Sequence, residues 1–191
     1  NSDVYRRMIE DMDINCGDVI EGVPLEEKGR EIFDMILKTA SGQKTKSEAL
    51  GYGDPAGDWR LRELVAAYLR SSRGLTCTPE QVLITCGSQQ AISLCAQLLL
   101  QAGERVAIEN PGYRAAGHAF AVAGARLCGV PVDDEGLDTA ALQALGTCRL
   151  AYVTPSHQYP TGVTLSLARR LELLAWAARH AAWVIEDDYD G

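Results

Sequence analysis

The pattern of apolar and polar positions predicts strands and helices that alternate along most of the chain. Short apolar, β-branched runs alternate with amphipathic stretches whose apolar residues recur at helical spacing. The predicted strands are residues 82–85, 105–109, 126–132, 149–154 and 182–185, and the predicted helices are residues 61–69, 91–98, 115–123, 137–145 and 165–178. This alternation predicts the α/β class, with a mostly parallel sheet covered by helices on both faces in three αβα layers.

The stretch at residues 81–100 is the element around which we expect a site to form. Its apolar run is followed by Gly87, Ser88 and Gln89 and then by an apolar helical pattern, which predicts a strand, a tight turn and a helix. The first N–H groups of such a helix point outward at the positive end of its dipole, and a glycine lets the backbone approach a ligand. The turn therefore predicts an anion cup suited to phosphate. An ordinary connection in which Ser88 caps the helix is the alternative.

Composition and charge narrow the function classes. The 191 residues are 47% apolar, which suffices for a core, and the net charge of −8 argues against a nucleic-acid surface. No apolar run of membrane-spanning length and no signal-peptide pattern occurs, so we expect a cytoplasmic protein with no membrane partner. The six cysteines form no C-x-x-C pair and no histidine stands at metal-ligand spacing, so we assign no metal-binding residue.

Lysine is distributed unevenly and suggests two segments. All four lysines, Lys28, Lys38, Lys44 and Lys46, precede residue 47, and arginine alone supplies the later basic side chains other than histidine. This shift predicts a short helical segment at residues 1–50 and a second domain at residues 51–191.

The first segment resembles a known family. The strings NSDVYRRMIEDMDINCGDVIEG and EEKGREIFDMILKTASGQKTKSEALGYG resemble the C-terminal tail of the altronate and galactarate dehydratases, which are metal-dependent hydro-lyases of sugar acids. The resemblance covers only that tail and implies no catalytic or metal residue. A fragment of a sugar-acid dehydratase is therefore the alternative function.

In a parallel sheet, ligands bind at the carboxyl ends of the strands, and the conspicuous motifs of the second domain fall there. Besides the glycine turn at residues 87–89, these are residues 111–113, 156–162 and 187–189. Together they offer an anion cup, an aromatic face, polar donors and a carboxylate. This set suits a flat, phosphorylated heteroaromatic ring, with Tyr113 stacked on it and Asp187 at a protonated ring nitrogen.

Five motifs in order carry a second resemblance. The strings YGDPAGDWRLRELVAAYLR, ITCGSQQAIS, ENPGYRAA, TPSHQYPTG and VIEDDYD resemble the aminotransferase-like domain of MocR-type regulators, a branch of fold-type I pyridoxal-phosphate proteins that is similar to class I and II aminotransferases. The resemblance covers residues 51–191. It implies pyridoxal 5′-phosphate as cofactor, an amino acid or amine as small-molecule ligand, and a homodimer.

The resemblance also implies the cofactor-binding residues. Gly87, Ser88 and Gln89 would hold the phosphate, Tyr113 the ring face, Asp187 the pyridine nitrogen, Tyr189 the ring hydroxyl, and Tyr52 the phosphate of a neighbouring subunit. Tyr159 stands where the commoner aminotransferase pattern has asparagine. Which of His157, Gln158 and Tyr159 contacts the ring hydroxyl is therefore open.

The second domain departs from the family at the nucleophile. Pyridoxal-phosphate enzymes use a lysine amine to form a Schiff base, and residues 47–191 contain no lysine. In the family this lysine lies beyond the DDYD motif, so we expect a truncated half-domain without catalytic residues. Whether the parent is an enzyme or the effector domain of a regulator is open, and we expect no DNA-binding domain in this chain.

Overall fold

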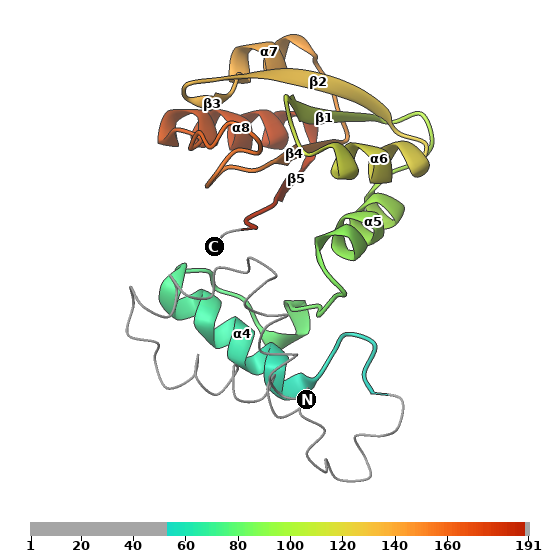
Figure 1. Cartoon of the computed structure of the whole chain (residues 1–191), viewed down its shortest axis with the longest axis vertical. Coiled ribbons are helices and arrows are strands. Elements are labelled where there is room, and N and C mark those ends of the chain that lie inside the picture. Colours follow the sequence, from blue (N-terminus) through green and yellow to red (C-terminus); the bar gives the residue numbers. More distant parts are fainter. Residues whose placement is uncertain (1–52, 190–191) are drawn as a thin grey trace. The chain divides into compact units, whose positions relative to one another are not determined.

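The computed structural model describes residues 53–189, which divide into two units (Figure 1). The described part of the first unit is residues 53–85, and that of the second is residues 86–189. The boundary falls just before the predicted phosphate-binding turn. The segment predicted over residues 1–50, its boundary with the second domain, and Tyr52 all lie outside the described residues.

The first unit contains the predicted amphipathic helix. Helix α4 (Trp59–Ser72) begins after Asp58, whose side chain accepts a hydrogen bond from a backbone N–H of the first turn. A short 3-10 helix, η2 (Pro79–Gln81), follows it. Arg62 of α4 is buried and donates to the carbonyl oxygen of Val82 at 2.9 Å, which ties the two helices together.

The prediction of a strand over residues 82–85 is wrong. The backbone at Val82 is extended, with φ −99° and ψ 126°, and the N–H of Ile84 donates to the carbonyl oxygen of Ala56 at 2.9 Å. No strand within residues 53–189 pairs with this segment. A strand is defined by its ladder of hydrogen bonds, so an extended, apolar run without a neighbour does not form one.

The second unit is built on a five-stranded sheet. Its order is β3-β2-β1-β4-β5, in which β1, β2, β4 and β5 are parallel and β3 runs antiparallel to β2. The strands are β1 (Arg105–Asn110), β2 (Arg126–Asp133), β3 (Gly136–Leu137), β4 (Leu150–Val153) and β5 (Trp183–Glu186). The predicted strands over residues 105–109, 126–132, 149–154 and 182–185 are thereby confirmed.

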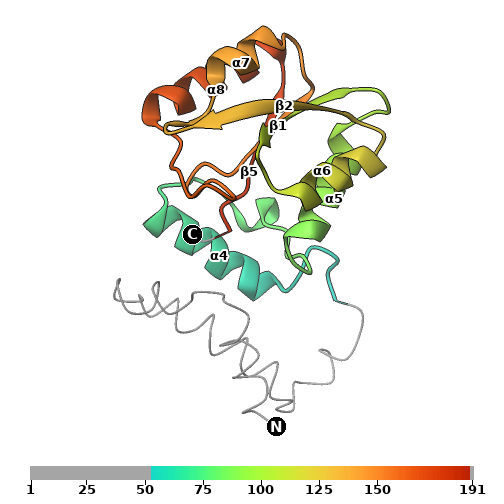
Figure 2. The same cartoon turned by 45° about the horizontal axis from the view of Figure 1, so that its top comes forward.

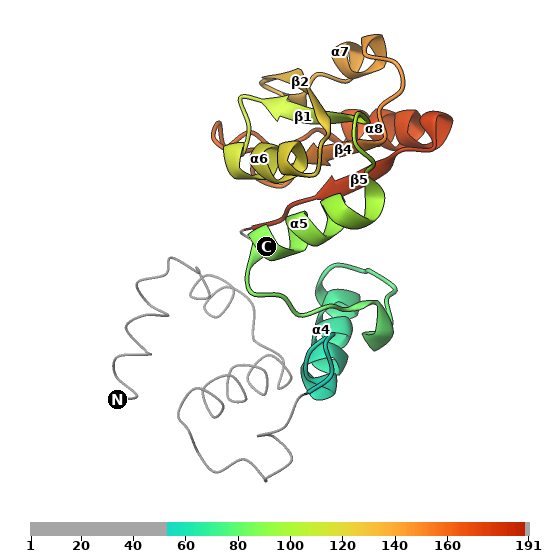
Figure 3. The same cartoon turned by 90° about the vertical axis from the view of Figure 1, so that its right-hand side faces the viewer.

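Helices cover both faces of this sheet. Helices α5 and α6 lie on one side and α7 and α8 on the other, as Figures 2 and 3 show. Their bounds are α5 (Ser88–Leu99), α6 (Arg114–Val122), α7 (Thr139–Ala144) and α8 (Leu167–His180). The three-layer αβα prediction is confirmed.

Alternating strand residues supply the two halves of the core. Val106 and Ile108 of β1 pack with Phe120 on the α5 and α6 side, whereas Ala107 between them packs with Trp176 on the α7 and α8 side. Successive side chains of a strand point to opposite faces, which is why both layers find an apolar surface. Burial on both faces also accounts for the continuous apolar runs of β1 and β4.

The short strand β3 was not predicted from the sequence. The helix predicted over residues 137–145 starts only at Thr139, because the side chain of Asp138 caps it by accepting from the N–H groups of Ala140 and Ala141 at 2.9 and 3.0 Å. The preceding Gly136–Leu137 pairs with the end of β2 instead.

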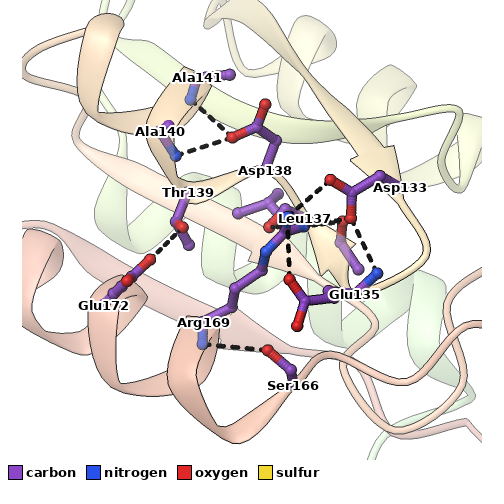
Figure 4. Close-up of polar contacts among 11 residues, drawn as sticks. Asp133, Glu135, Leu137, Asp138, Thr139, Ala140, Ala141, Ser166, Arg169 and Glu172 are labelled. Atoms are coloured by element: carbon purple, nitrogen blue, oxygen red, sulfur yellow. Dashed lines mark hydrogen bonds and ion pairs between the residues drawn. The ribbon is translucent and has the colours of Figure 1, made fainter.

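Arg169 fastens α8 to the β2–β3 turn (Figure 4). Its guanidinium donates to both carboxylate oxygens of Asp133, at 2.5 and 2.7 Å, and to the carbonyl oxygens of Gly136 and Leu137 at 2.9 and 3.1 Å. The planar fork of arginine matches a carboxylate in this bidentate way. The Arg169 guanidinium lowers the pKa of Asp133, chiefly through these hydrogen bonds.

Candidate functional site

The carboxyl ends of three parallel strands lie at one edge of the second unit. β1 leads into Pro111, Gly112 and Tyr113, β4 leads into Thr154 and residues 155–162, and β5 leads into Asp187. The end of the sheet therefore brings together the strand-end motifs that the sequence predicted at residues 111–113, 156–162 and 187–189.

The N-terminus of α5 has the geometry expected of an anion cup. Gly87 is its N-cap with φ +84°, a left-handed conformation that favours glycine, and no side chain caps the helix. Ser88 is the first helical residue, so the alternative in which Ser88 caps the helix is not what the structure has. Residues 86–90 are exposed, which leaves the positive helix end open to a ligand.

A hydrogen bond joins the N-terminus of α5 to the loop after β1. The side-chain amide of Gln89 donates to the hydroxyl of Tyr113 at 3.3 Å. Gly112 allows the loop to turn, because a Cβ atom there would lie 2.3 Å from the carbonyl oxygen of Glu109. The predicted phosphate-side residue and the predicted stacking tyrosine are thus neighbours.

Three tyrosines line up across the loops. Tyr113 meets Tyr159 edge-to-face with ring centroids 5.8 Å apart, and Tyr159 meets Tyr189 in the same way at 6.4 Å. Such T-shaped contacts are favoured by the charge distribution of aromatic rings. Tyr189 is exposed and adjoins the ring of His157, with centroids 6.3 Å apart.

Asp187 is held by a residue that the sequence analysis missed. The hydroxyl of Tyr152 donates to a carboxylate oxygen of Asp187 at 2.5 Å, and the backbone N–H of Asp187 donates to the carbonyl oxygen of Val153 at 2.9 Å. Tyr152 is completely buried on β4. Its sequence context is only an apolar strand, so nothing in the pattern distinguished it from a core tyrosine.

A buried carboxylate, Glu109, was also missed. One of its oxygens accepts from the N–H and the hydroxyl of Thr154, at 3.2 and 2.7 Å, and from the side-chain amide of Gln158 at 3.2 Å. Glu109 is 4% exposed, and its burial raises the pKa of the carboxyl group. It links the end of β1 to the loop after β4, the two segments that carry Tyr113 and Tyr159. A carboxylate near the end of an apolar strand was the sequence signal that could have indicated this residue.

Gln158, one of the three alternatives for the ring hydroxyl, makes several hydrogen bonds within the protein. Gln158 is 1% exposed, and its amide nitrogen also donates to the carbonyl oxygens of Pro111 and Tyr159. Its amide oxygen accepts from the N–H and the hydroxyl of Thr161. These contacts hold the loop after β4 together, and which of His157, Gln158 and Tyr159 would contact the ring hydroxyl stays a prediction.

A pocket of about 760 Å³ adjoins the tyrosines. Tyr113, Tyr159 and Glu109 line it together with two basic side chains of α6, Arg114 and His118. Asp187 and the start of α5 do not line it. The pocket therefore flanks the predicted ring site and does not enclose it.

The described residues offer neither a metal-binding cluster nor a membrane-spanning helix. Residues 53–189 hold no cluster of three or more His, Cys, Asp or Glu side chains that could bind a metal ion. Of the helices formed by these residues, none is long and apolar enough to cross a bilayer.

The fold and the strand-end motifs define the class of protein, and comparisons with solved structures agree. The α-aminoadipate aminotransferase LysN of Thermus thermophilus, solved with N-(5′-phosphopyridoxyl)-L-leucine, is 35% identical with a TM-score of 0.70, over 83% of this chain and 40% of that chain. The kynurenine aminotransferase of Pyrococcus horikoshii is 32% identical with a TM-score of 0.69, over 84% of this chain and 40% of that chain. The α/β domain is therefore of the fold-type I class of pyridoxal-phosphate aminotransferases.

Comparisons of sequence show the family. The family model "Aminotransferase class I and II" matches residues 18–189, so the chain belongs to that family. The probable rhizopine catabolism regulatory protein MocR of Rhizobium meliloti is 41% identical over 140 residues, which are 73% of this chain and 28% of that protein. The aromatic-amino-acid aminotransferase 1 of Thermococcus litoralis is 29% identical over 187 residues, which are 92% of this chain and 45% of that protein.

These relatives bear out the function class named from the five motifs. The chain has an aminotransferase-like domain of the kind found in MocR-type regulators and in aminotransferases. It spans only about a quarter to a half of the curated relatives that it matches. The comparisons give no support to the sugar-acid dehydratase alternative.

Proposed function

We propose that residues 86–189 bind pyridoxal 5′-phosphate, as the cofactor-binding part of an aminotransferase-like enzyme or of a regulator that senses an amino acid or amine. One observation carries this proposal. The uncapped start of α5 is joined through Gln89 to Tyr113, and the carboxylate of Asp187 follows β5 at the same end of the sheet.

Each subsite matches one part of the cofactor. The backbone at Gly87, Ser88 and Gln89 suits the phosphate, because the positive end of the α5 dipole favours an anion. Tyr113 offers a ring face, and Asp187 offers a counter-charge to a protonated ring nitrogen. When bound, this cofactor supplies an electron sink for chemistry at the α-carbon of amino acids.

Two further roles are part of the proposal. Tyr189 serves the ring hydroxyl, together with His157, Gln158 or Tyr159 from the loop after β4. Tyr52 reaches the phosphate of a neighbouring subunit in a homodimer. Binding within this chain is non-covalent, because the only lysines are those before residue 47.

The test uses pyridoxamine 5′-phosphate, a form of the cofactor that needs no lysine. The 191-residue chain is titrated with it by calorimetry, and we expect saturable binding that inorganic phosphate competes away. Asp187→Ala removes the counter-charge and should weaken binding about 10- to 100-fold, as the loss of a hydrogen bond to a charged group does.

The neighbouring Asp188→Ala is the matched control, since Asp188 is exposed and is itself assigned no contact with the cofactor. We expect its affinity for the probe to stay within about twofold of the wild type. Absence of saturable binding, or an equal loss in both variants, would overturn the proposal. Adding amino acids or amines to the loaded protein then identifies the second ligand.

A further inference from the structure

Tyr152 and Asp187 face each other because of strand register. Tyr152 of β4 pairs with Ile185 of β5 in the parallel ladder. Side chains two residues apart on an extended chain share a face, so Asp187 follows Ile185 onto the side where Tyr152 lies. The hydrogen bond of 2.5 Å between the phenol and the carboxylate is the result.

The phenol is a permanent donor in this position. Tyr152 is 0% exposed, and burial together with the hydrogen bond to Asp187 raises the pKa of its hydroxyl far above the ordinary value. The ring is fixed by Phe120, which contacts it at 5.7 Å between centroids with an interplanar angle of 66°. A buried, rigid hydroxyl that keeps its proton can only donate to the carboxylate, which in turn loses its freedom to rotate.

We propose that Tyr152 is a positioning residue for the cofactor: its phenol holds one oxygen of Asp187 so that the other oxygen faces the protonated ring nitrogen of a bound pyridoxal derivative. This inference rests on the proposed function. Among residues 53–189, the contacts found for the Asp187 carboxylate are on the oxygen that Tyr152 occupies, which leaves the second oxygen available. Tyr152 does not touch the cofactor and acts through Asp187.

The experiment compares two probes, pyridoxamine 5′-phosphate and its 1-deaza analogue, in which carbon replaces the ring nitrogen. Both probes share the phosphate and the ring face. Tyr152→Phe keeps the buried ring and removes only the hydroxyl. It should raise the Kd for pyridoxamine 5′-phosphate about 3- to 10-fold, as the loss of one hydrogen bond does. For the 1-deaza analogue the change should stay below about twofold.

Three other variants complete the design. Asp187→Asn should abolish the preference for the nitrogen-containing probe, and adding Tyr152→Phe to it should cause no further loss. Tyr68→Phe, which removes a phenol hydroxyl from α4 in the other unit, should leave both affinities unchanged. Equal losses of both probes in Tyr152→Phe would mean that the hydroxyl only stabilises the fold, and no loss of either would mean that it has no role. Both outcomes overturn the inference.

A separate measurement distinguishes failure of the inference from failure of the proposed function. In the chain without any probe, NMR should detect a tyrosine hydroxyl proton that exchanges slowly with water and disappears in both Tyr152→Phe and Asp187→Ala. If that resonance is absent, Tyr152 does not hold Asp187, whatever the chain binds. If it is present and the wild type binds neither probe, the proposed cofactor site is wrong and the positioning role toward it falls as well.

Discussion

Removal of the buried carboxylate Glu109 is the sharpest test of how the site is held together. Glu109→Leu keeps most of the side-chain volume and takes away the acceptor of three hydrogen bonds. The amide of Gln158 retains two carbonyl acceptors in the variant. The N–H and the hydroxyl of Thr154 lose the acceptor that Glu109 provides.

The expected cost follows from those two donors. A buried donor without a partner costs about 1–3 kcal/mol, and a volume-conserving swap adds little cavity energy. Relief from burying a carboxylate offsets part of this cost. We therefore expect Glu109→Leu to lower the free energy of unfolding by about 2–4 kcal/mol at neutral pH, and Glu109→Gln, which keeps an acceptor oxygen, by about 1 kcal/mol or less.

The pH dependence separates the two variants further. Because the folded pKa of Glu109 lies above its ordinary value of 4.5, the folded state binds the proton more tightly than the unfolded state. The free energy of unfolding of the wild type therefore contains a component that falls as pH rises from about 4.5 through the raised pKa. Glu109→Gln has no such group, so its stability relative to the wild type should improve as pH rises.

Urea unfolding of the chain at a series of pH values, followed by circular dichroism, measures both effects. Glu186→Gln is the matched control, since Glu186 is an exposed carboxylate on β5 and its substitution should change little. A cost below about 1 kcal/mol for Glu109→Leu would refute the argument from unpaired donors. A pH profile of Glu109→Gln that parallels the wild type would refute the raised pKa.

Substitutions at four other positions test the fold around the site. Trp176 is completely buried and its indole N–H has no partner among the described residues, so Trp176→Phe should cost about 1–2 kcal/mol and Trp176→Ala about 3–5 kcal/mol in chemical unfolding. Arg169→Lys loses the bidentate contact and two carbonyl partners and should cost about 1–3 kcal/mol. Arg169 lowers the folded pKa of Asp133 below the ordinary value of 3.8. The stability that this ion pair contributes is therefore present above pH 3.8 and is lost as pH falls through the folded pKa. Asp133→Asn should abolish this pH dependence. Gly87→Ala puts a side chain at φ +84°, which costs about 1–2 kcal/mol, and thermal melts with phosphate titration should show lower stability and weaker anion binding.

The chain's local patterns predicted most of the second unit. Short apolar runs predicted β1, β2, β4 and β5, and helical spacing of apolar residues predicted the helices between them. The pattern is clearest for β1 and β4, which are buried on both faces. The same patterns overpredicted a strand at residues 82–85, since an apolar run carries no information about whether a neighbouring strand exists. They also extended a helix through Leu137, where pairing with β2 outweighs the local preference.

Some residues of the candidate site could be named from the sequence, but their roles could not be tested. Gly87, Tyr113 and Asp187 could be named because turn glycines and strand-end polar residues are conspicuous, and the parallel order of the strands predicts that they meet at one edge. Their roles toward a cofactor remain predictions, as do those of Ser88 and Gln89, although the contact between Gln89 and Tyr113 agrees with a common site.

The side chains that support those residues are evident only from the way the strands pair. Tyr152 and Glu109 lie in strands. From sequence alone, such a tyrosine is indistinguishable from a core residue, and such a carboxylate from a residue at the edge of the sheet. Their function depends on what the neighbouring strand places opposite them, Asp187 in one case and Thr154 with Gln158 in the other. The periodicity and the turn chemistry of each segment can be seen in its own residues. Strand register fixes the partners of the buried polar groups, and these partners lie 35 to 49 positions apart in the sequence, beyond the reach of any local pattern.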